Sequence, residues 1–431
     1  MENNRAAFCS LGCKVNQYET NAMIQNFLNH GYEIVEFDEV ADVYIVNTCT
    51  VTSIADRKSR QMLRRAKELN RESIVVACGC YAQVAADELN KMQEVDLVIG
   101  NNEKKDIFEI VEKYMEEKLK ENHVSDVMYK EDYVEFGPTT YTEKTRAVIK
   151  VQDGCDRFCS YCLIPFARGH IRSRSVENVI EEIKKIVDDG FKEVVITGIH
   201  IASYGRDFKD GTSLIDLLEE INKIDGLQRI RLGSIEPVIM TEDFINRLSK
   251  LEKICDHFHL SLQSGCTETL KRMNRRYTAD EFLWATERLR AKFPNAALTT
   301  DIIVGFPGET EEEFEKTYEF LKKIKFYQMH VFKYSPRKGT KAAVMPNQID
   351  GNIKEARSKR LIELSQNNEL EYNKSHISDE VEVLFEERDG DYYKGHTKNY
   401  IVVKYKTQDE LENCILKLKV VYANKDYLIA E

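Results

Sequence analysis

The chain has 431 residues, of which 42% are hydrophobic, and it carries a formal net charge of −11. This length exceeds that of one ordinary domain and predicts two or three domains with apolar cores. The acidic balance excludes a global positive field, so any contact with nucleic acid must rest on local basic patches. Eleven cysteines, with neither a leader-like N-terminus nor a long apolar run, predict a cytoplasmic protein that does not enter a membrane and uses cysteine for metal binding or catalysis.

The first 115 residues alternate strand-like and helix-like segments. Apolar runs of strand length, separated by helical segments, cover residues 5–11, 42–48, 73–79 and 96–100. This alternation predicts an α/β domain with a doubly wound parallel sheet.

Three cysteines, here called the N-terminal cysteines, follow three of these predicted strands: Cys13, Cys49 and Cys80. Ligands of open α/β sheets bind at the carboxyl edge of the strands, so we expect the three thiols to converge although they are far apart in the sequence. The pattern predicts a metal site with three protein ligands. Cys9 and Cys78 lie inside the strands and are interpreted as small buried hydrophobic residues.

Residues 53–69 form a predicted helix that begins at Thr52 or Ser53. Its basic residues recur every three or four positions and share one face: Arg57, Arg60, Arg64 and Lys67. The face is either a solvated surface or a contact for polynucleotide phosphates.

Residues 116–140 are rich in charge and reach the pair Gly137-Pro138, which indicates a linker. Over residues 141–372 the alternation resumes, with strand-like runs at 145–151, 193–198, 230–235, 257–264, 297–306 and 328–334. Six strand–helix units predict a partial (β/α)6 barrel, whose chemistry should lie at the carboxyl ends of the strands.

The loop after the first of these strands contains Cys155, Cys159 and Cys162, here called the loop cysteines. A cubane iron–sulfur cluster normally takes four cysteines, so three ligands leave one iron open for chemistry. The alternatives are a zinc knuckle and a structural cysteine cluster, and zinc would need a fourth ligand that does not stand nearby at a zinc-finger spacing.

Both cysteine sets resemble those of the methylthiotransferase family of radical S-adenosylmethionine (SAM) enzymes. The resemblance rests on LGCKVNQYE at 11–19, NTCTVT at 47–52, GCYAQ at 79–83 and the loop at 155–162, and it covers essentially the whole chain. It implies two 4Fe-4S clusters, one on each cysteine set, and SAM bound to the open iron of the loop cluster. The activity it implies is insertion of a methylthio group.

The resemblance also implies SAM contacts at the carboxyl ends of the barrel strands. Thr197 and Gly198 would hold the amino group, Glu236 the ribose, and Gly305 would lie near the adenine. Gln263 and His200 would face the same cavity. Arg168, Arg172 and Arg174 follow the loop closely, and they could hold either the SAM carboxylate, a role assigned to Arg174, or an anionic substrate.

Residues 373–431 alternate apolar and polar positions between turns and predict a small antiparallel β-barrel. It resembles the TRAM domain, an RNA-binding module. Tyrosines interleaved with lysines would suit base stacking and phosphate contact: Tyr392, Tyr393, Tyr400, Lys394, Lys398 and Lys404. The segment has more acids than bases, so a barrel that serves packing alone is the alternative.

The family branch that the sequence resembles most closely modifies carbon 2 of threonylcarbamoyl-adenosine next to the tRNA anticodon. It would take tRNA as its substrate and an electron donor such as flavodoxin or ferredoxin. The arginines near the loop favour this base, because a guanidinium can clamp its carboxylate. The alternatives are isopentenyl-adenosine in tRNA, a ribosomal-protein side chain, and a non-enzymatic iron–sulfur scaffold or electron carrier.

Overall fold

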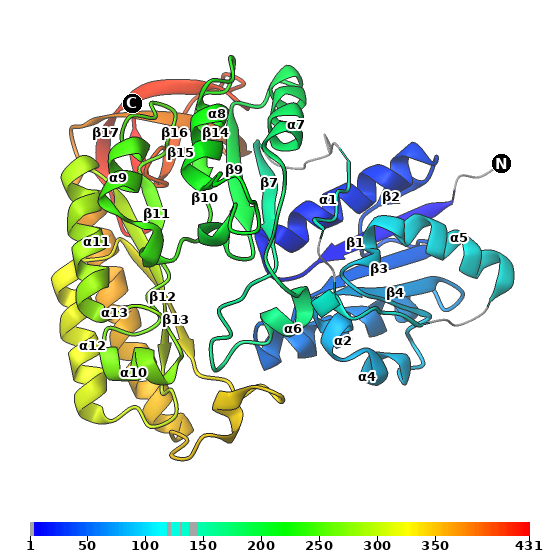
Figure 1. The fold of residues 1–431 in the computed structure, drawn as a ribbon. Helices are drawn as coiled ribbons and strands as arrows, with labels where there is room; N and C mark the ends of the chain where they lie inside the picture. Colours follow the sequence, from blue (N-terminus) through cyan, green and yellow to red (C-terminus); the bar gives the residue numbers. More distant parts are fainter. Residues whose placement is uncertain (1–3, 119–121, 130–131, 138–144) are drawn as a thin grey trace.

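The structure is a computed structural model that describes residues 4–118, 122–129, 132–137 and 145–431. An N-terminal α/β domain, a central partial barrel and a small closed C-terminal barrel follow one another along the chain (Figure 1). Among the described residues, no helix is long and apolar enough to cross a membrane.

The N-terminal domain contains a six-stranded sheet in the order β2-β1-β3-β4-β5-β6, and all of its strand pairs are parallel. The predicted strands are β1 (Arg5–Ser10), β3 (Val43–Thr48), β4 (Ile74–Gly79) and β5 (Leu97–Ile99). Two edge strands, β2 (Glu33–Val35) and β6 (Asn122–His123), were not predicted, because two or three residues are too short to show a pattern.

Helices cover both faces of this sheet. They are α1 (Lys14–Asn29), α2 (Ser53–Leu69), α3 (Cys80–Val84), α4 (Ala86–Asn90) and α5 (Ile107–Glu117). The predicted domain end at residue 115 falls inside α5, and β6 extends the sheet into the predicted linker. Pro138 of the predicted Gly-Pro turn lies outside the described residues.

Helix α1 is buried on more than its sheet-facing side. Its apolar Met23 and Phe27 pack in the core of the N-terminal domain, whereas its polar Asn16, Glu19 and Thr20 are also buried. These polar residues are covered because α1 also packs against the first strands of the central domain (Figure 1). The helix is therefore the main element between the two domains.

The central domain has six parallel strands in the order β7-β9-β10-β11-β12-β13, as the sequence predicts. The strands are β7 (Arg146–Asp153), β9 (Glu193–Gly198), β10 (Arg229–Leu232), β11 (His257–His259), β12 (Ala297–Val304) and β13 (Gln328–Lys333). Isolated bridges such as Ile235 to Leu260 join β10 to the β11 side. A short antiparallel strand, β8 (Arg172–Ser173), pairs with β7.

Most helices of the central domain lie outside this curved sheet, and the first of them packs against α3 of the N-terminal domain. They are α6 (Ile164–Arg168), α7 (Val176–Asp188), α8 (Leu214–Asn222), α9 (Glu242–Leu248), α10 (Thr267–Arg272), α11 (Ala279–Lys292), α12 (Glu311–Ile324) and α13 (Gly351–Ser375). Thr310 caps α12 in a capping box with Glu313, which explains why this helix begins where the sequence predicts.

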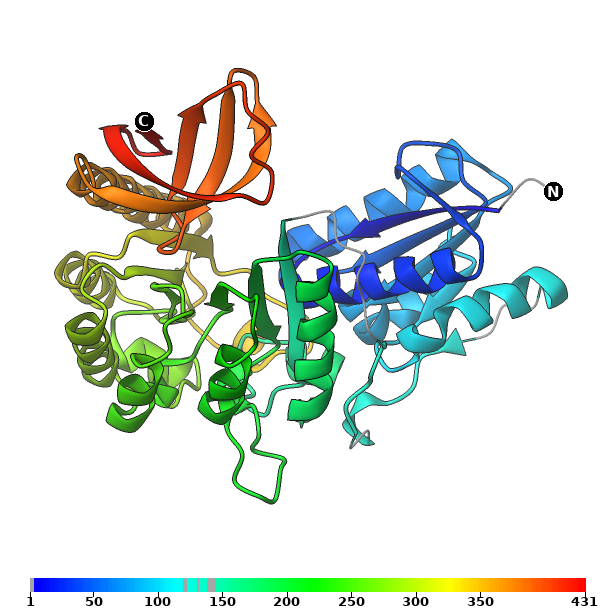
Figure 2. The same ribbon diagram turned by 90° about the horizontal axis from the view of Figure 1, so that it is seen from above.

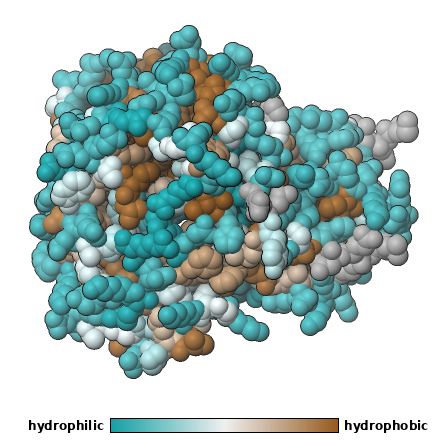
Figure 3. All heavy atoms as spheres, in the orientation of Figure 1, coloured by the Kyte–Doolittle hydropathy of each residue, from teal (hydrophilic) through white to brown (hydrophobic). Residues whose placement is uncertain are grey.

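The C-terminal segment forms a closed barrel, in the order β14-β15-β16-β18-β17. Its strand pairs are antiparallel as predicted, except that β16 and β18 run parallel. Its strands are β14 (Glu380–Asp389), β15 (Tyr392–Thr397), β16 (Val402–Lys406), β17 (Ile415–Ala423) and β18 (Leu428–Ala430). In the view from above, this barrel and the N-terminal domain lie on separate parts of the central domain (Figure 2). On the face shown in Figure 3, apolar residues reach the surface in separate patches, as in most globular proteins.

Candidate metal centre

The loop cysteines lie at the carboxyl end of β7. The turn that leads into the loop requires glycine, because Gly154 has a φ of +72° and a Cβ there would lie 1.7 Å from the His170 carbonyl oxygen. Burial raises the pKa of Cys162 to about 12. Cys159 and Cys155 lie close enough to Cys162 to raise its pKa further, so the three thiols are near one another. The structure therefore brings the three predicted ligands together.

The segment after α10 holds this loop in place. The Ser160 amide donates to the Met273 carbonyl at 3.0 Å, and the Asn274 side chain donates to the Phe158 carbonyl at 2.9 Å. Arg275 also donates from Nη1 to Cys159 Sγ at 3.3 Å. Residues 271–278 are rich in basic side chains, and the structure shows that this segment supports the cysteine loop.

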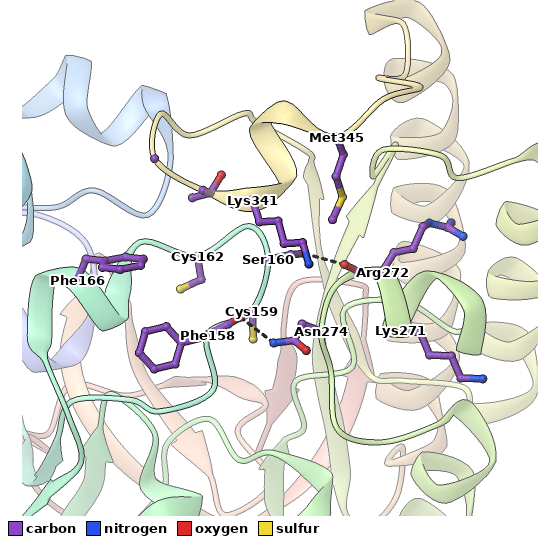
Figure 4. A pocket seen from close by; sticks show the side chains of 12 residues that line it. Phe158, Cys159, Ser160, Cys162, Phe166, Lys271, Arg272, Asn274, Lys341 and Met345 are labelled. Atoms are coloured by element: carbon purple, nitrogen blue, oxygen red, sulfur yellow. Dashed lines mark hydrogen bonds between the residues drawn. The ribbon is translucent and has the colours of Figure 1, made fainter.

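A cavity of about 420 Å³ opens beside the loop cysteines (Figure 4). Cys159 and Cys162 line it together with the aromatic rings of Phe158 and Phe166. The two rings meet edge to face, with centroids 5.9 Å apart. Two thiols and two aromatic rings therefore line the same cavity.

The N-terminal cysteines also converge, at the carboxyl edge of their sheet. Burial, with smaller contributions from Cys80 and Cys13, raises the pKa of Cys49 to about 12. Gly12 brings the first loop against Cys49, because its φ is +98° and a Cβ would lie 2.5 Å from Cys49 Sγ. The sequence predicts that these three thiols converge because each follows the end of a strand. The structure agrees, since thiols from three separate loops meet.

Three cysteines in each place fit the ligand set of an iron–sulfur cluster, in which each cysteine binds a different iron and one iron has no protein ligand.

Helix α6 connects the two sites. It begins two residues after Cys162, and at 1.5 Å per residue its five residues span roughly 7.5 Å. Its last residue, Arg168, donates from Nε to Cys80 Sγ at 3.2 Å. The loop cysteines and the N-terminal cysteines therefore lie at opposite ends of one short helix.

The three arginines that follow the loop are buried and lie beside protein carboxylates. Arg168 is fully buried and pairs with Glu19 and, at 3.4 Å, with Asp153. Arg172 is buried beside Asp153, and Arg174 pairs with Glu135 at 2.9 Å and with Glu182. Carboxylates therefore pair with Arg168 and Arg174, whereas Nε and Nη1 of Arg172 form no hydrogen bond among the described residues. A role of these arginines toward SAM or substrate stays a prediction.

Glu236 is the centre of a second charged cluster at the barrel mouth. It accepts from Arg275 at 3.0 Å and His200 Nε2 at 3.1 Å, and it also pairs with Arg157. Burial opposes ionisation of Glu236, but these partners outweigh it and lower its pKa to about 2. Since Arg275 also contacts Cys159, the carboxylate is tied to the cysteine loop through one side chain.

The other predicted SAM contacts lie at strand ends around the same barrel. Thr197 and Gly198 end β9, where Gly198 pairs with Gln152 of β7. Gln263 has a φ of +69°, and its amide donates to the Asp301 carbonyl at 2.8 Å. Gly305 follows β12 with a φ of +69°, and its amide donates to Glu309 at 2.7 Å. Their roles toward a ligand stay predictions.

Comparison with known proteins shows the family to which the chain belongs. The radical SAM superfamily pattern matches residues 149–321, and the pattern of the uncharacterized protein family UPF0004 matches residues 5–100. The threonylcarbamoyladenosine tRNA methylthiotransferase MtaB of Bacillus subtilis is 42% identical over 98% of this chain and 94% of its own. The chain belongs to the methylthiotransferase family of radical SAM enzymes.

Other relatives agree with this membership. MtaB of Aquifex aeolicus is 42% identical over 93% of this chain and 96% of its own. The tRNA-2-methylthio-N(6)-dimethylallyladenosine synthase of Caldicellulosiruptor saccharolyticus is 36% identical over 97% of this chain and 90% of its own. The solved radical SAM methyltransferase TsrM of Kitasatospora setae shares the fold, with a TM-score of 0.58 and 13% identity over 77% of this chain and 73% of its own.

Membership in a radical SAM family implies a 4Fe-4S cluster and SAM as cofactors of this methylthiotransferase. The residues needed to support them were only partly predicted. Gln152, Arg157 and Arg275 hold His200, Glu236 and the cysteine loop, but isolated polar residues of this kind give no pattern in a single sequence.

Two predicted RNA contacts of the methylthiotransferase are occupied by protein groups. On the basic face of α2, Arg60, Arg64 and Lys67 pair with Glu88, Glu94 and Asp96. In the C-terminal barrel, Lys394 and Lys404 pair with Glu387 and Asp389, and Lys398 reaches the Glu252 carbonyl at 3.4 Å. Ion pairs within each domain, and one hydrogen bond between domains, thus account for most of this basic pattern.

The predicted stacking tyrosines of the barrel are also used within the protein. Tyr393 is buried and donates to Glu410 at 2.7 Å. Tyr400 packs against the central domain, with the Arg231 guanidinium 4.6 Å from its ring centroid and the His257 ring 5.0 Å away. These two tyrosines are therefore packing residues, and the prediction that they stack on RNA bases is corrected.

Proposed function

We propose that this enzyme methylthiolates carbon 2 of threonylcarbamoyl-adenosine next to the anticodon of tRNA. The observation that carries the proposal is the 42% identity to two MtaB enzymes over nearly the whole chain. Carbon 2 of adenine offers neither an acidic proton nor a leaving group, so acid–base catalysis alone has no point of attack. When bound, a reduced 4Fe-4S cluster and SAM supply a deoxyadenosyl radical that can remove a hydrogen atom from such a carbon.

We assign the SAM-binding cluster to the loop cysteines and a second 4Fe-4S cluster to the N-terminal cysteines. The assignment is supported by the convergence of three thiols in each place. In this arrangement α6 keeps the two clusters close to each other. The second cluster would supply the sulfur, and an external donor such as flavodoxin or ferredoxin would supply electrons.

A second cavity between the domains suits the modified base. It has a volume of about 690 Å³ and is lined by residues that directly follow three of the cysteines: Thr50, Tyr81 and Leu163. Phe166 lines both this cavity and the smaller one beside the loop cysteines, and half of its side chain is exposed. A nucleotide turned out of the anticodon loop could stack on this ring while its carbon 2 lies between the cysteine sites.

The carboxylate of the threonylcarbamoyl group needs a cation, and lysines offer one in addition to the three buried arginines. Lys271 and Lys341 line the cavity beside the loop cysteines, and Lys338 lines the cavity between the domains. An ammonium group can pair with a carboxylate at such a position. The preference for the carboxylate-bearing base therefore rests on the relatives and on these lysines.

The second candidate substrate is isopentenyl-adenosine, because the 36% identical relative from Caldicellulosiruptor saccharolyticus is named for its dimethylallyl form. Purified enzyme with reductant and SAM would be offered one tRNA with threonylcarbamoyl-adenosine and one with isopentenyl-adenosine. Mass spectrometry of the nucleosides should show the methylthio product on the first tRNA only. Product on the isopentenyl tRNA alone would refute the proposal.

A further inference from the structure

A group of metal-ligand side chains lies on three adjacent strands of the central barrel, away from both cysteine sites. His259 ends β11, Asp301 lies within β12 and His330 lies within β13. The donor atoms of these three side chains all lie within 4.8 Å of one another. The register explains their meeting, since Asp301 is the direct partner of His330, and His259 is the partner of Thr299.

These side chains point into the barrel. Leu298, Ile302 and Val304 of β12 pack in the core between the strands and the outer helices. Successive residues of a strand point to opposite faces, so Thr299 and Asp301 face the interior of the barrel. Asp301 also belongs to the strand that leads to Gly305, and its carbonyl accepts from the Gln263 amide at 2.8 Å. The group thus lies deeper in the barrel than the predicted SAM contacts.

The contact between His259 and Asp301 has the spacing of two ligands on one metal ion. Nε2 of His259 is 3.2 Å from Oδ2 of Asp301. This nitrogen is buried, and among the described residues it forms no hydrogen bond. An ordinary ion pair would direct the ring N–H at the carboxylate. Two ligand atoms about 2.1 Å from a common ion, at angles from octahedral to tetrahedral, would lie about 3.0 to 3.4 Å apart.

The other nitrogen of His259 is held as in known metal sites. Nδ1 lies 3.0 Å from the Thr299 hydroxyl oxygen, which in turn lies 3.3 Å from Nε2 of His257. A hydrogen bond from Nδ1 to the hydroxyl leaves Nε2 without a proton, so its lone pair can bind a cation beside the carboxylate. Metal-binding histidines usually show this kind of outer support, which fixes the tautomer and the ring. The ring of His330 lies face to face with that of His259, with centroids 5.8 Å apart.

We propose that His259, Asp301 and His330 bind one divalent transition-metal ion, such as Zn²⁺, inside the barrel. Two imidazoles and one carboxylate are a recurrent ligand set for such ions, and they leave positions open. His330 is exposed, so water or an anionic oxygen of a molecule bound in the barrel can take an open position. The ion is distinct from both iron–sulfur clusters and rests on no cysteine.

The test uses the full-length enzyme with both clusters reconstituted, so that iron occupies the cysteines. Zn²⁺ is added, excess is removed by gel filtration, and zinc and iron are measured together. Wild type should retain about one zinc per chain, and X-ray absorption should show nitrogen and oxygen neighbours at about 2.0 to 2.2 Å without sulfur at about 2.3 Å. His330→Gln and Asp301→Asn should each weaken zinc binding at least tenfold with unchanged iron content.

The matched control is His30→Gln, which removes a histidine that stacks on Phe108 in the N-terminal domain. It should retain zinc as wild type does. Wild type that retains no zinc, a sulfur shell in the absorption spectrum, or equal zinc affinity in His330→Gln and wild type would each overturn the proposal. The spectrum of wild type decides the case even if a variant fails to fold. The result is independent of tRNA methylthiolation, which these measurements do not use.

Discussion

Burial makes three of the site cysteines hard to ionise. Burial raises the pKa of Cys155 to about 11 and of Cys49 and Cys162 to about 12, because the thiolate loses water. Metal ligation requires the thiolate, so cluster assembly must release protons. Residue type and strand position were enough to predict that these cysteines converge, whereas the support of Arg168 for Cys80 and of Arg275 for Cys159 depends on contacts across more than 80 residues.

Removal of one cysteine set should leave the other intact. In the variant with Cys13, Cys49 and Cys80 changed to Ala, reconstituted protein should hold about four irons in place of about eight. Cleavage of SAM should persist, since the loop cysteines are unchanged, and methylthiolation should cease. Iron analysis and detection of 5′-deoxyadenosine check these outcomes.

The matched control changes Cys255, Cys266 and Cys414, which belong to neither set, to Ala. It should keep about eight irons. If the N-terminal triple variant lost SAM cleavage while the control kept it, the proposed division of roles between the two sites would be wrong.

At the scale of elements, hydrophobic patterns predicted most of the fold but few of its contacts. The longer strands of the N-terminal sheet, the six barrel strands and the closed C-terminal barrel follow the predicted runs, because each buries an apolar face. Charged residues carried less information: Tyr400 and Lys398 fit an RNA surface by composition, yet they contact the central domain. A basic or aromatic pattern does not reveal whether another domain covers it.

The exposed strand β17 is the better candidate for a tRNA contact in this barrel. Lys417 and Lys419 are exposed, and Tyr422 on the same strand is 50% exposed. The double variant Lys417→Glu and Lys419→Glu should weaken tRNA binding and lower the slope of log affinity against log salt by about 2. A binding titration at several salt concentrations measures both effects.

The control for β17 is the double variant Lys322→Glu and Lys323→Glu on α12, which makes the same charge change on an exposed outer helix. Its affinity and slope should stay close to wild type. Equal losses in both double variants would indicate a general charge effect, and no loss in the β17 variant would leave the barrel as a packing domain.

At the scale of the whole molecule, the domain arrangement depends on a buried ionic network around α6 and α1. Arg168 lies at its centre, with Glu19 of α1 on one side and Asp153 of β7 on the other. Lys104 and Lys150 also pair with Glu19, at 2.5 and 2.7 Å. Because Arg168 also donates to Cys80 and to Asn16, the same residue fixes the domain interface and the distance between the two cysteine sites.

Loss of Arg168 should therefore loosen the interface. Arg168→Met leaves two buried carboxylates with fewer cations, which should cost about 3 to 5 kcal/mol of the free energy of unfolding. Arg168→Lys keeps the charge but loses the forked geometry, so its loss should be intermediate. The control is Arg65→Met, which breaks an exposed pair with Asp38 at 2.7 Å and should leave stability close to that of wild type. Denaturant midpoints measure stability, and amide exchange over residues 16–19 and 164–168 should accelerate in Arg168→Met alone. Equal stability of the Arg168→Met and Arg65→Met variants, with unchanged exchange, would show that apolar packing rather than this network holds the domains together.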